Sequence, residues 1–294
     1  MDRLQSMATF VAVASAGSFS AAGRQLRTPL PTVSRRVSEL ESHLGARLFV
    51  RSTRKLALTE VGEGYLASCK RLLEEVADAE RTASGQYTVP QGELVVTAPV
   101  AFGRFHVLPV ITEFLKGHAQ VDVRLVLSDR SLDLIEQHID LAIRIGVLPD
   151  SRLVAAQIGK VRNVVCASPA YLKAHGTPKS PEDLARHACV TFARFGQESV
   201  WLFQDQRVVT VRSRLLVNNA ESAVDAAVAG IGITRVVSYQ AATAVKARKL
   251  EIVLKKFEPD PLPVNLVHVQ DRRPTAKLRA FIDFAGPRLR ERLR

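Results

Sequence analysis

The hydrophobic periodicity of the chain changes near residue 90, and this change limits the fold more than any other feature. Before it, apolar residues recur at helical spacing, whereas beyond it short strand-like runs alternate with helical segments. The segment SGQYTVPQGE at 84–93 has the composition of a linker. A length of 294 residues is sufficient for two or three domains. We therefore predict a multi-domain chain with a helical N-terminal part and a larger α/β part.

Short helices separated by breaks are predicted at the start of the chain. The first covers about 2–15 and can end at Gly17, and either Ser18 or Ser20 can cap the second, which extends to Leu26. The third can stop at Gly45 and carries apolar residues on one face, namely Val33, Val37, Leu40 and Leu44. Helices with these breaks fit a helix-turn-helix in a three-helix core.

Two short strand-like runs follow, Leu48–Val50 and Lys55–Leu58, on either side of the basic turn Arg51–Arg54. They predict a wing, that is, a small hairpin whose tip carries positive charge.

A long helix is then predicted from Thr59, its cap, to about Tyr87. Its apolar and small residues form a heptad-like stripe, namely Tyr65, Cys69, Leu72, Val76, Ala79 and Ala83. Such a stripe can pack on the helix's own domain or against a second copy. The length of the helix, its charged opposite face and its place between two domains favour a dimer.

Beyond residue 90, strands at ELVVTAP, VDVRLVL and DLAIRIG alternate with helices predicted at Phe102–Lys116 and Leu132–His138. This order indicates a parallel sheet. A second α/β block is predicted from Val154 to about Val267, and a helix from about Pro274 to Leu293 ends the sequence. Two α/β lobes joined by crossing segments typically bind small ligands in the cleft between them.

Positive charge is concentrated in two places, within a formal net charge of +12. Residues 1–58 carry nine Lys and Arg against three Asp and Glu, and the residues after Asp271 carry eight against two. Either region could meet a polyanion. In the second, the cations alternate with apolar residues at helical spacing, which favours the solvated face of a terminal helix over a DNA-binding arm.

Several function classes find no support in the sequence. Cys69, Cys166 and Cys189 are far apart and indicate ordinary buried thiols rather than disulfides or metal ligands. No GxSxG, P-loop or HExxH motif is present, so we do not expect an enzyme, a metal site or a cofactor. No apolar run approaches the roughly 20 residues that span a bilayer. The N-terminus resembles an amphipathic helix rather than a signal peptide, so we expect a cytoplasmic protein without a membrane partner.

The ordered motifs F-VA-AGSFS-AA--L, VSRRV-ELE--LG-RLF-R and LT--G make the first 66 residues resemble the DNA-binding domain of the LysR-type transcriptional regulators. The linker helix and the two-lobed, periplasmic-binding-protein-like α/β part are similar to that family too. The resemblance implies a winged helix-turn-helix DNA-binding domain at 1–58, a linker and dimerisation helix at 59–88 and an effector-binding domain at 89–294. Within the last, one lobe is expected at about 91–160 and 268–294 and the other at about 161–267.

In the family, the start of the recognition helix commonly reads Ser-Gln-Pro-Ala-Val-Ser, whereas here residues 29–34 read PLPTVS. Pro31 keeps the proline expected at the first helical position. Pro29 replaces the usual cap, so that capping is weakened or passes to Thr28. Leu30 replaces a base-reading glutamine and can contact only an apolar group such as a thymine methyl. The expected DNA-contacting residues are Ser20, Leu30, Pro31, Thr32, Ser34, Arg35, Arg36, Arg51 and Arg54, with Thr9 as a weaker candidate for a phosphate contact.

Effector-binding residues are expected at strand ends and helix N-termini that face the cleft. By position they are Pro99, Val100, Ala101, Phe102, Ser128, Asp129, Arg144, Gly146, Thr191, Asn219, Glu221 and Thr234. Arg144 could bind a ligand carboxylate, or it could pair internally with Asp129 or Asp140.

The sequence therefore predicts a regulator that binds double-stranded promoter DNA as a homo-oligomer and responds to a small-molecule effector of unknown identity. A dimer through the linker helix and a tetramer are both expected, and RNA polymerase is a candidate partner. The alternative is a small-molecule-binding protein of the periplasmic-binding type without gene control, but it leaves residues 1–88 without a purpose.

Overall fold

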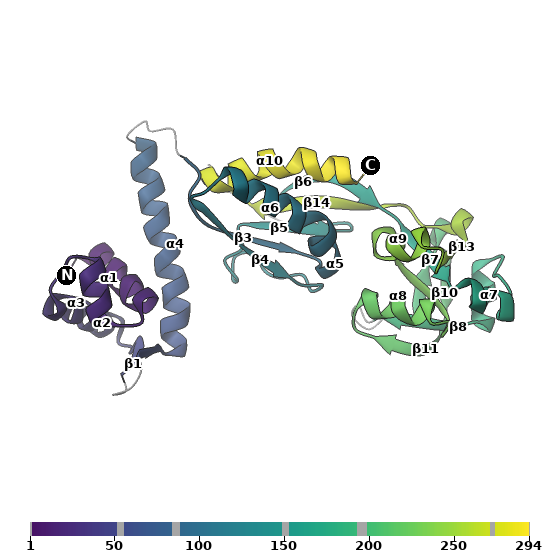
Figure 1. Ribbon diagram of the computed structural model, residues 1–294, viewed down its shortest axis with the longest axis horizontal. Helices are drawn as coiled ribbons and strands as arrows, with labels where there is room; N and C mark the ends of the chain where they lie inside the picture. The colour runs from purple at the N-terminus through teal and green to yellow at the C-terminus, as the bar shows by residue number, and fades with distance from the viewer. Residues whose placement is uncertain are drawn as a thin grey trace. The chain divides into compact units, whose positions relative to one another are not determined.

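The computed structural model describes residues 2–51, 56–83, 89–148, 153–192, 199–270 and 274–293 (Figure 1). The chain divides into two compact units, Met1–Val89 and Pro90–Arg294. Each unit has its own buried core.

The N-terminal unit is a winged helix-turn-helix with an added long helix. Its elements are α1 (Arg3–Ala16), α2 (Phe19–Gln25), α3 (Leu30–Leu44), β1 (Phe49–Arg51), β2 (Leu56–Leu58) and α4 (Glu60–Ala83). The two strands pair antiparallel, with Phe49 opposite Leu58, and form the predicted wing. Phe10, Val33 and Val37 are fully buried where the helices meet.

The breaks between these helices follow from single residues. Gly17 and Gly45 end α1 and α3 in the left-handed conformation, with φ values of 63° and 64°. Ser18, rather than Ser20, caps α2, since its Oγ accepts a hydrogen bond from the Ala21 N–H. Thr59 caps α4 in the same way by accepting from the Gly62 N–H at 2.9 Å.

The stripe on α4 divides between two environments. Cys69 is fully buried, and Tyr65 packs on Phe10 with ring centroids 5.7 Å apart. The first part of the stripe therefore packs on its own unit, as the alternative interpretation allowed. Leu72 is 39% exposed and remains available for another surface. Burial raises the pKa of the Cys69 thiol. It raises the pKa values of Cys166 and Cys189 to about 12, so all three are ordinary buried thiols.

The first sheet of the C-terminal unit has five strands in the order β4–β3–β5–β14–β6. Their bounds are β3 (Gly92–Ala98), β4 (Val121–Leu127), β5 (Leu141–Ile145), β6 (Leu153–Val161) and β14 (Leu262–Val269). β3 is parallel to β4 and β5, whereas β14 is antiparallel to β5 and β6. The predicted parallel arrangement of β3, β4 and β5 is confirmed, whereas the insertion of β14 in the opposite direction was not predicted.

Two other expectations about this lobe need correction. Residues Leu132–His138 form turns and not a helix. The chain re-enters the first sheet at Leu262 and not at 268, because the whole of β14 pairs with β6.

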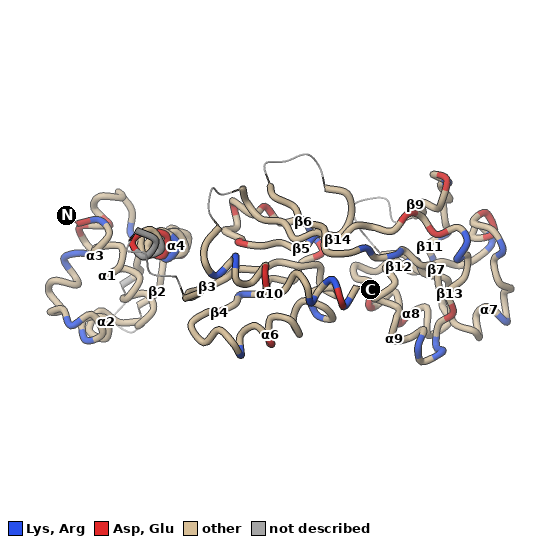
Figure 2. Tube along the Cα trace, turned by 90° about the horizontal axis from the view of Figure 1, so that it is seen from above, with Lys and Arg blue, Asp and Glu red and all other residues tan. Residues whose placement is uncertain are grey.

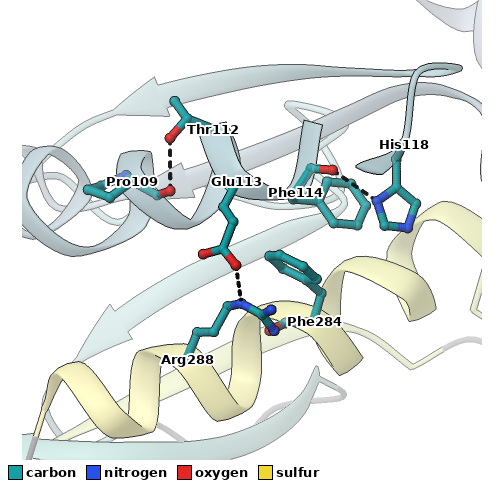
Figure 3. Close-up of polar contacts among 7 residues, drawn as sticks. All are labelled: Pro109, Thr112, Glu113, Phe114, His118, Phe284 and Arg288. Atoms are coloured by element: carbon teal, nitrogen blue, oxygen red, sulfur yellow. Dashed lines mark hydrogen bonds and ion pairs between the residues drawn. The ribbon is translucent and has the colours of Figure 1, made fainter. Parts of the chain in front are cut away.

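Helices cover this sheet. They are α5 (Val100–Phe102), the π-helical segment η1 (Gly103–Val107), α6 (Leu108–Gly117) and α10 (Ala276–Arg292). Figure 3 shows α6 and α10 joined by Arg288, whose Nε lies 3.0 Å from Glu113 Oε1 while its guanidinium lies 3.6 Å above the Phe284 ring. Phe114 packs edge-on against Phe281 at 5.1 Å. The basic terminal helix is thus anchored to the first lobe.

The second sheet also has five strands, in the order β11–β8–β12–β7–β13. Its strands are β7 (Asn163–Ala167), β8 (Ala188–Phe192), β11 (Arg212–Val217), β12 (Ile233–Val237) and β13 (Glu251–Val253). Around it lie α7 (Pro169–His175), α8 (Ala220–Val228), α9 (Ser238–Lys246), the 3-10 segments η2 (Pro181–Arg186), η3 (Gln204–Gln206) and η4 (Lys255–Phe257), and the hairpin of β9 (Val200–Leu202) and β10 (Val208–Thr210). The unit is therefore two-lobed, with one sheet in each lobe.

No single helix among the described residues is long and apolar enough to cross a membrane. The bent pair α1 and α2, at 116°, meets the length and composition test together. Phe10, Val13 and Ala22 of that pair are fully buried in the core of the N-terminal unit.

Candidate functional site

The recognition helix α3 has two chemically different faces. Val33, Val37 and Leu40 are fully buried against the other helices. The opposite face is exposed or half-buried and carries Thr32, Ser34, Arg35 and Arg36. A short helix held by one apolar face and presenting hydroxyls and guanidinium groups on the other can enter a DNA groove.

The start of α3 differs slightly from the prediction. Leu30 is the first helical residue, so Pro31 takes the second position, where its missing N–H still costs nothing. Pro29 stands at the N-cap and provides no side-chain hydrogen bond. Capping does not pass to Thr28, whose hydroxyl instead donates to the Leu26 carbonyl at 3.1 Å.

The two adjacent arginines of α3 have different surroundings. The Arg35 side chain is 71% exposed, and its Nε lies 3.8 Å from Glu39 Oε1. Exposed ion pairs one helical turn apart contribute only about 0.3–0.5 kcal/mol to stability. A DNA phosphate or base could therefore replace Glu39 as the partner of Arg35. Arg36 has no ion pair with any residue that the structure describes.

Beside the start of α3 lies an open hollow that the sequence did not indicate. Its lining residues are Ser20, Gly23, Arg24, Arg27, Thr28, Pro29 and Leu30. Leu30 is 45% exposed, and the predicted DNA-contacting residue Ser20 is exposed as well. Arg24, at the end of α2, and Arg27, in the turn before α3, were missed, because the sequence does not show that they line this hollow.

The remaining predicted contacts have mixed outcomes. Thr9 is a correction, since it is 1% exposed and its hydroxyl donates to the Gln5 carbonyl at 2.7 Å. Arg51 is the last residue of β1, and Arg54 lies outside the described residues.

The residues expected at the effector cleft divide into those at lobe edges and those in the core. Phe102 and Thr234 are fully buried, and the Thr234 hydroxyl donates to the Val190 carbonyl at 3.0 Å. Thr191 is 2% exposed and shares a 2.6 Å hydrogen bond with the Ser213 hydroxyl. These three are corrections, because packing and internal hydrogen bonds occupy them. Pro99 and Ala101 are also buried, at the start of α5.

Internal partners occupy most of the edge residues too. The Val100 N–H donates to the Asp129 carboxylate at 3.2 Å, while the Ser128 hydroxyl accepts from the Arg130 N–H. Asn219 caps α8 by accepting from the Ser222 N–H at 2.8 Å. Gly146 takes a φ of 112°, which favours glycine.

Arg144 forms no ion pair with Asp129 or Asp140, and its contact with a ligand carboxylate stays a prediction. Its Nη2 donates to the backbone carbonyl of Leu132 at 2.9 Å. Asp140 is engaged elsewhere, because its carboxylate accepts from the Val95 N–H at 2.8 Å. Arg144 therefore holds the turn after β4 and forms no ion pair with a described acid.

Glu221 joins the two lobes. Its Oε1 lies 3.0 Å from Nη1 of Arg104, a residue of η1 that the sequence did not single out. Near this pair, Tyr239 of α9 meets Phe102 and His106 edge-on, at 5.5 and 5.4 Å. Burial, together with the charge of Arg292, lowers the pKa of His106. The Arg104–Glu221 ion pair and this aromatic cluster therefore both contribute to contact between the lobes.

Among the described residues, no group of three or more His, Cys, Asp and Glu side chains could hold a metal ion.

Comparison with known proteins agrees with this architecture. A family model described as "Bacterial regulatory helix-turn-helix protein, lysR family" matches residues 4–63, and one described as "LysR substrate binding domain" matches residues 88–290. The chain is 34% identical to the "Probable HTH-type transcriptional regulator LtrA" of Klebsiella pneumoniae, covering 97% of this chain and 94% of that protein. It is also 34% identical to the regulator CrgA of Neisseria meningitidis serogroup C, covering 95% of each.

Solved structures agree as well. The structure of CrgA, described as a LysR-type transcriptional regulator from Neisseria meningitidis, matches with a TM-score of 0.63 and 33% identity over 97% of this chain and 98% of that one. The full-length Vibrio cholerae virulence activator AphB matches with a TM-score of 0.61 and 26% identity over 96% and 98%. These relatives are regulators and not enzymes, and the chain belongs to the LysR family of bacterial transcriptional regulators, with a helix-turn-helix DNA-binding domain followed by an effector-binding domain.

Proposed function

We propose that the protein binds promoter DNA as an oligomer and that a small-molecule effector held between its two lobes resets this binding. The two-faced helix α3 carries the proposal. Its apolar side is fully buried at Val33 and Val37, while Arg35 and Arg36 lie on the side turned away from the core. This arrangement leaves the basic side available to a groove. DNA as the ligand also implies a cytoplasmic place of action, and RNA polymerase is a candidate partner at the promoter.

Exposed apolar residues on α4 support a dimer. Val61 and Leu72 are 57% and 39% exposed. They are eleven residues apart, which is about three helical turns, so they lie on the same face. A second copy of α4 would bury this face, and two such dimers would give a tetramer.

Contacts across the lobes support an effector response. The Arg104–Glu221 pair is partly exposed on both sides, at 63% and 44%. A ligand that enters between the lobes could replace either partner at small cost, because exposed ion pairs contribute little. We propose no bound cofactor or metal besides this effector.

The test of DNA binding starts from a random pool of duplexes. We expect the purified protein to enrich one duplex class at low salt, to footprint it, and to elute as a dimer or larger species in size-exclusion chromatography with light scattering. Failure of every duplex to bind at low salt would refute the proposal.

The effector is tested separately. A thermal-shift screen against small carboxylates and aromatic compounds should yield at least one compound that raises the melting temperature. That compound should also change the footprint of the selected duplex. A stabilising compound that leaves the footprint unchanged would contradict the proposed coupling.

A further inference from the structure

The turn between α2 and α3 contains an arginine in a conformation that favours glycine. Arg27 has a φ of 49°, in the left-handed region. The Thr28 N–H donates to the Gly23 carbonyl at 2.9 Å, and the Arg27 N–H donates to the Arg24 carbonyl at 3.2 Å. These two bonds form a Schellman motif, in which Arg27 occupies the position that glycine usually takes. Because arginine has a Cβ, this conformation strains the backbone at Arg27.

The turn cannot easily relax elsewhere. A Cβ added at Gly23 would lie 2.9 Å from the Thr28 carbonyl oxygen, so α2 and the turn are in close contact. A left-handed residue is therefore required at position 27, and in this chain that residue is an arginine.

Arg27 and Arg24 both line the hollow beside the start of α3 and both are exposed. Neither forms an ion pair with a residue in the part of the chain that the structure describes. The acidic residues of 1–58 are engaged elsewhere. Asp2 caps α1 by accepting from the Gln5 N–H, Glu39 pairs with Arg35, and Glu41 accepts from the Leu48 and Phe49 N–H groups.

We propose that Arg27 and Arg24 clamp a backbone phosphate of the DNA strand that borders the recognition helix. The left-handed backbone conformation of Arg27, although strained, places its side chain at the hollow beside α3. Guanidinium groups suit this ligand because their N–H groups pair bidentately with phosphate oxygens. The hydroxyl of Ser20, on the same hollow, is a further donor to the phosphate. The inference rests on the proposed DNA-binding function and adds two residues to it.

The variant Arg27→Gly tests whether Arg27 binds DNA or only stabilises the turn. Glycine adopts the same turn without strain, so this variant should melt at a higher temperature than the wild type. Its affinity for the selected duplex should nevertheless fall about tenfold, the loss expected for a charge-assisted hydrogen bond. The slope of log affinity against log salt concentration should decrease in magnitude by about 0.9, the value for one phosphate contact. A scrambled duplex should lose affinity by the same factor, since phosphates carry no sequence information.

Two further variants complete the experiment. Arg24→Ala, on a regular helix, should show the same loss of slope without a gain in melting temperature. Lys70→Ala removes an exposed cation of α4 and should change neither affinity nor slope. If Arg27→Gly and Arg24→Ala keep the slope of a wild type that binds DNA, the clamp is refuted and the proposed function stands. If the wild type binds no duplex, the proposed function itself fails.

Discussion

Residues 1–58 and the chain after Asp271 are the two basic regions of the sequence (Lys and Arg are blue in Figure 2). The cations of the two regions are engaged differently. In the first, Arg24, Arg27 and Arg36 have no ion pair with a described residue. In the second, Lys277 is buried with its Nζ 2.6 Å from the Glu93 carbonyl, and Arg288 joins α10 to α6. These two cations after Asp271 therefore hold the first lobe together, whereas the three arginines without a described ion pair in residues 1–58 are free to bind DNA.

The largest expected effect concerns the buried cation. Lys277→Ala should lower the free energy of unfolding of the C-terminal unit by about 3 kcal/mol, because it leaves buried polar groups without a partner. Burial raises the pKa of Asp140, and the charge of Lys277 opposes this rise. Without the ammonium group the folded pKa of Asp140 rises further, so the loss should grow as pH rises above the folded pKa that Asp140 has in the wild type. Urea titrations at pH 5 and pH 8 measure it, and a loss below about 0.5 kcal/mol would place Lys277 among the free surface cations.

Arg36 should show the opposite behaviour. Arg36→Ala should weaken binding to the selected duplex by about 1–3 kcal/mol, the range for one lost arginine contact to a base. The melting temperature should stay within the error of the wild type, since the side chain has no described ion pair. Fluorescence anisotropy and thermal melts check this together. A variant that melts earlier but binds normally would show that Arg36 is structural, like Arg288.

Arg288 gives a smaller effect on stability alone. Arg288→Ala removes the ion pair with Glu113 and the cation–π contact with Phe284, both partly exposed. A loss of about 1 kcal/mol in unfolding free energy is expected from exposed contacts of this kind. Arg288→Lys should recover only part of it, because an ammonium group lacks the planar stacking surface. Any loss of DNA affinity per folded molecule would contradict the separation of the two basic regions.

The smallest effect depends on pH. Burial and the charge of Arg292 lower the pKa of His106, so the unfolded state binds the proton more readily. Stability from this group is present above the unfolded pKa and is lost as pH falls through it towards the folded pKa. His106→Phe keeps an aromatic ring beside Tyr239 and should flatten the dependence between pH 7.5 and 5.5. Chemical denaturation at both pH values tests this, and an unchanged dependence would exclude His106 as its source.

Local signals in the sequence predicted the helix boundaries well, because a cap depends on one or two residues. Gly17, Ser18, Gly45 and Thr59 all act as single-residue signals at the ends of helices. The segment after Asp129 shows where such signals compete. Leu132–His138 has helical spacing, but the Asp133 carboxylate accepts from the Ile135 and Glu136 N–H groups and stabilises a turn instead.

Strand direction and the free or paired state of a cation depend on partners distant in sequence. The sequence did not indicate that β14 inserts antiparallel between β5 and β6. Nothing near Arg144 indicated that it binds the Leu132 carbonyl. Arg27 was missed because its importance lies in a backbone angle, and the residue type alone does not indicate it.

The most direct test compares two double variants that remove the same charge. Arg24→Ala with Arg27→Gly removes one exposed cation from the end of α2 and one from the turn before α3, and Arg290→Ala with Arg292→Ala removes two exposed cations from α10. The salt dependence of duplex binding is measured for both and for the wild type. The slope should decrease in magnitude by about 0.9 for the Arg24 and Arg27 variant, since both arginines hold the same phosphate, and stay unchanged for the α10 variant. Equal changes in both, or a change only in the α10 variant, would contradict the claim that Arg24 and Arg27 hold the DNA.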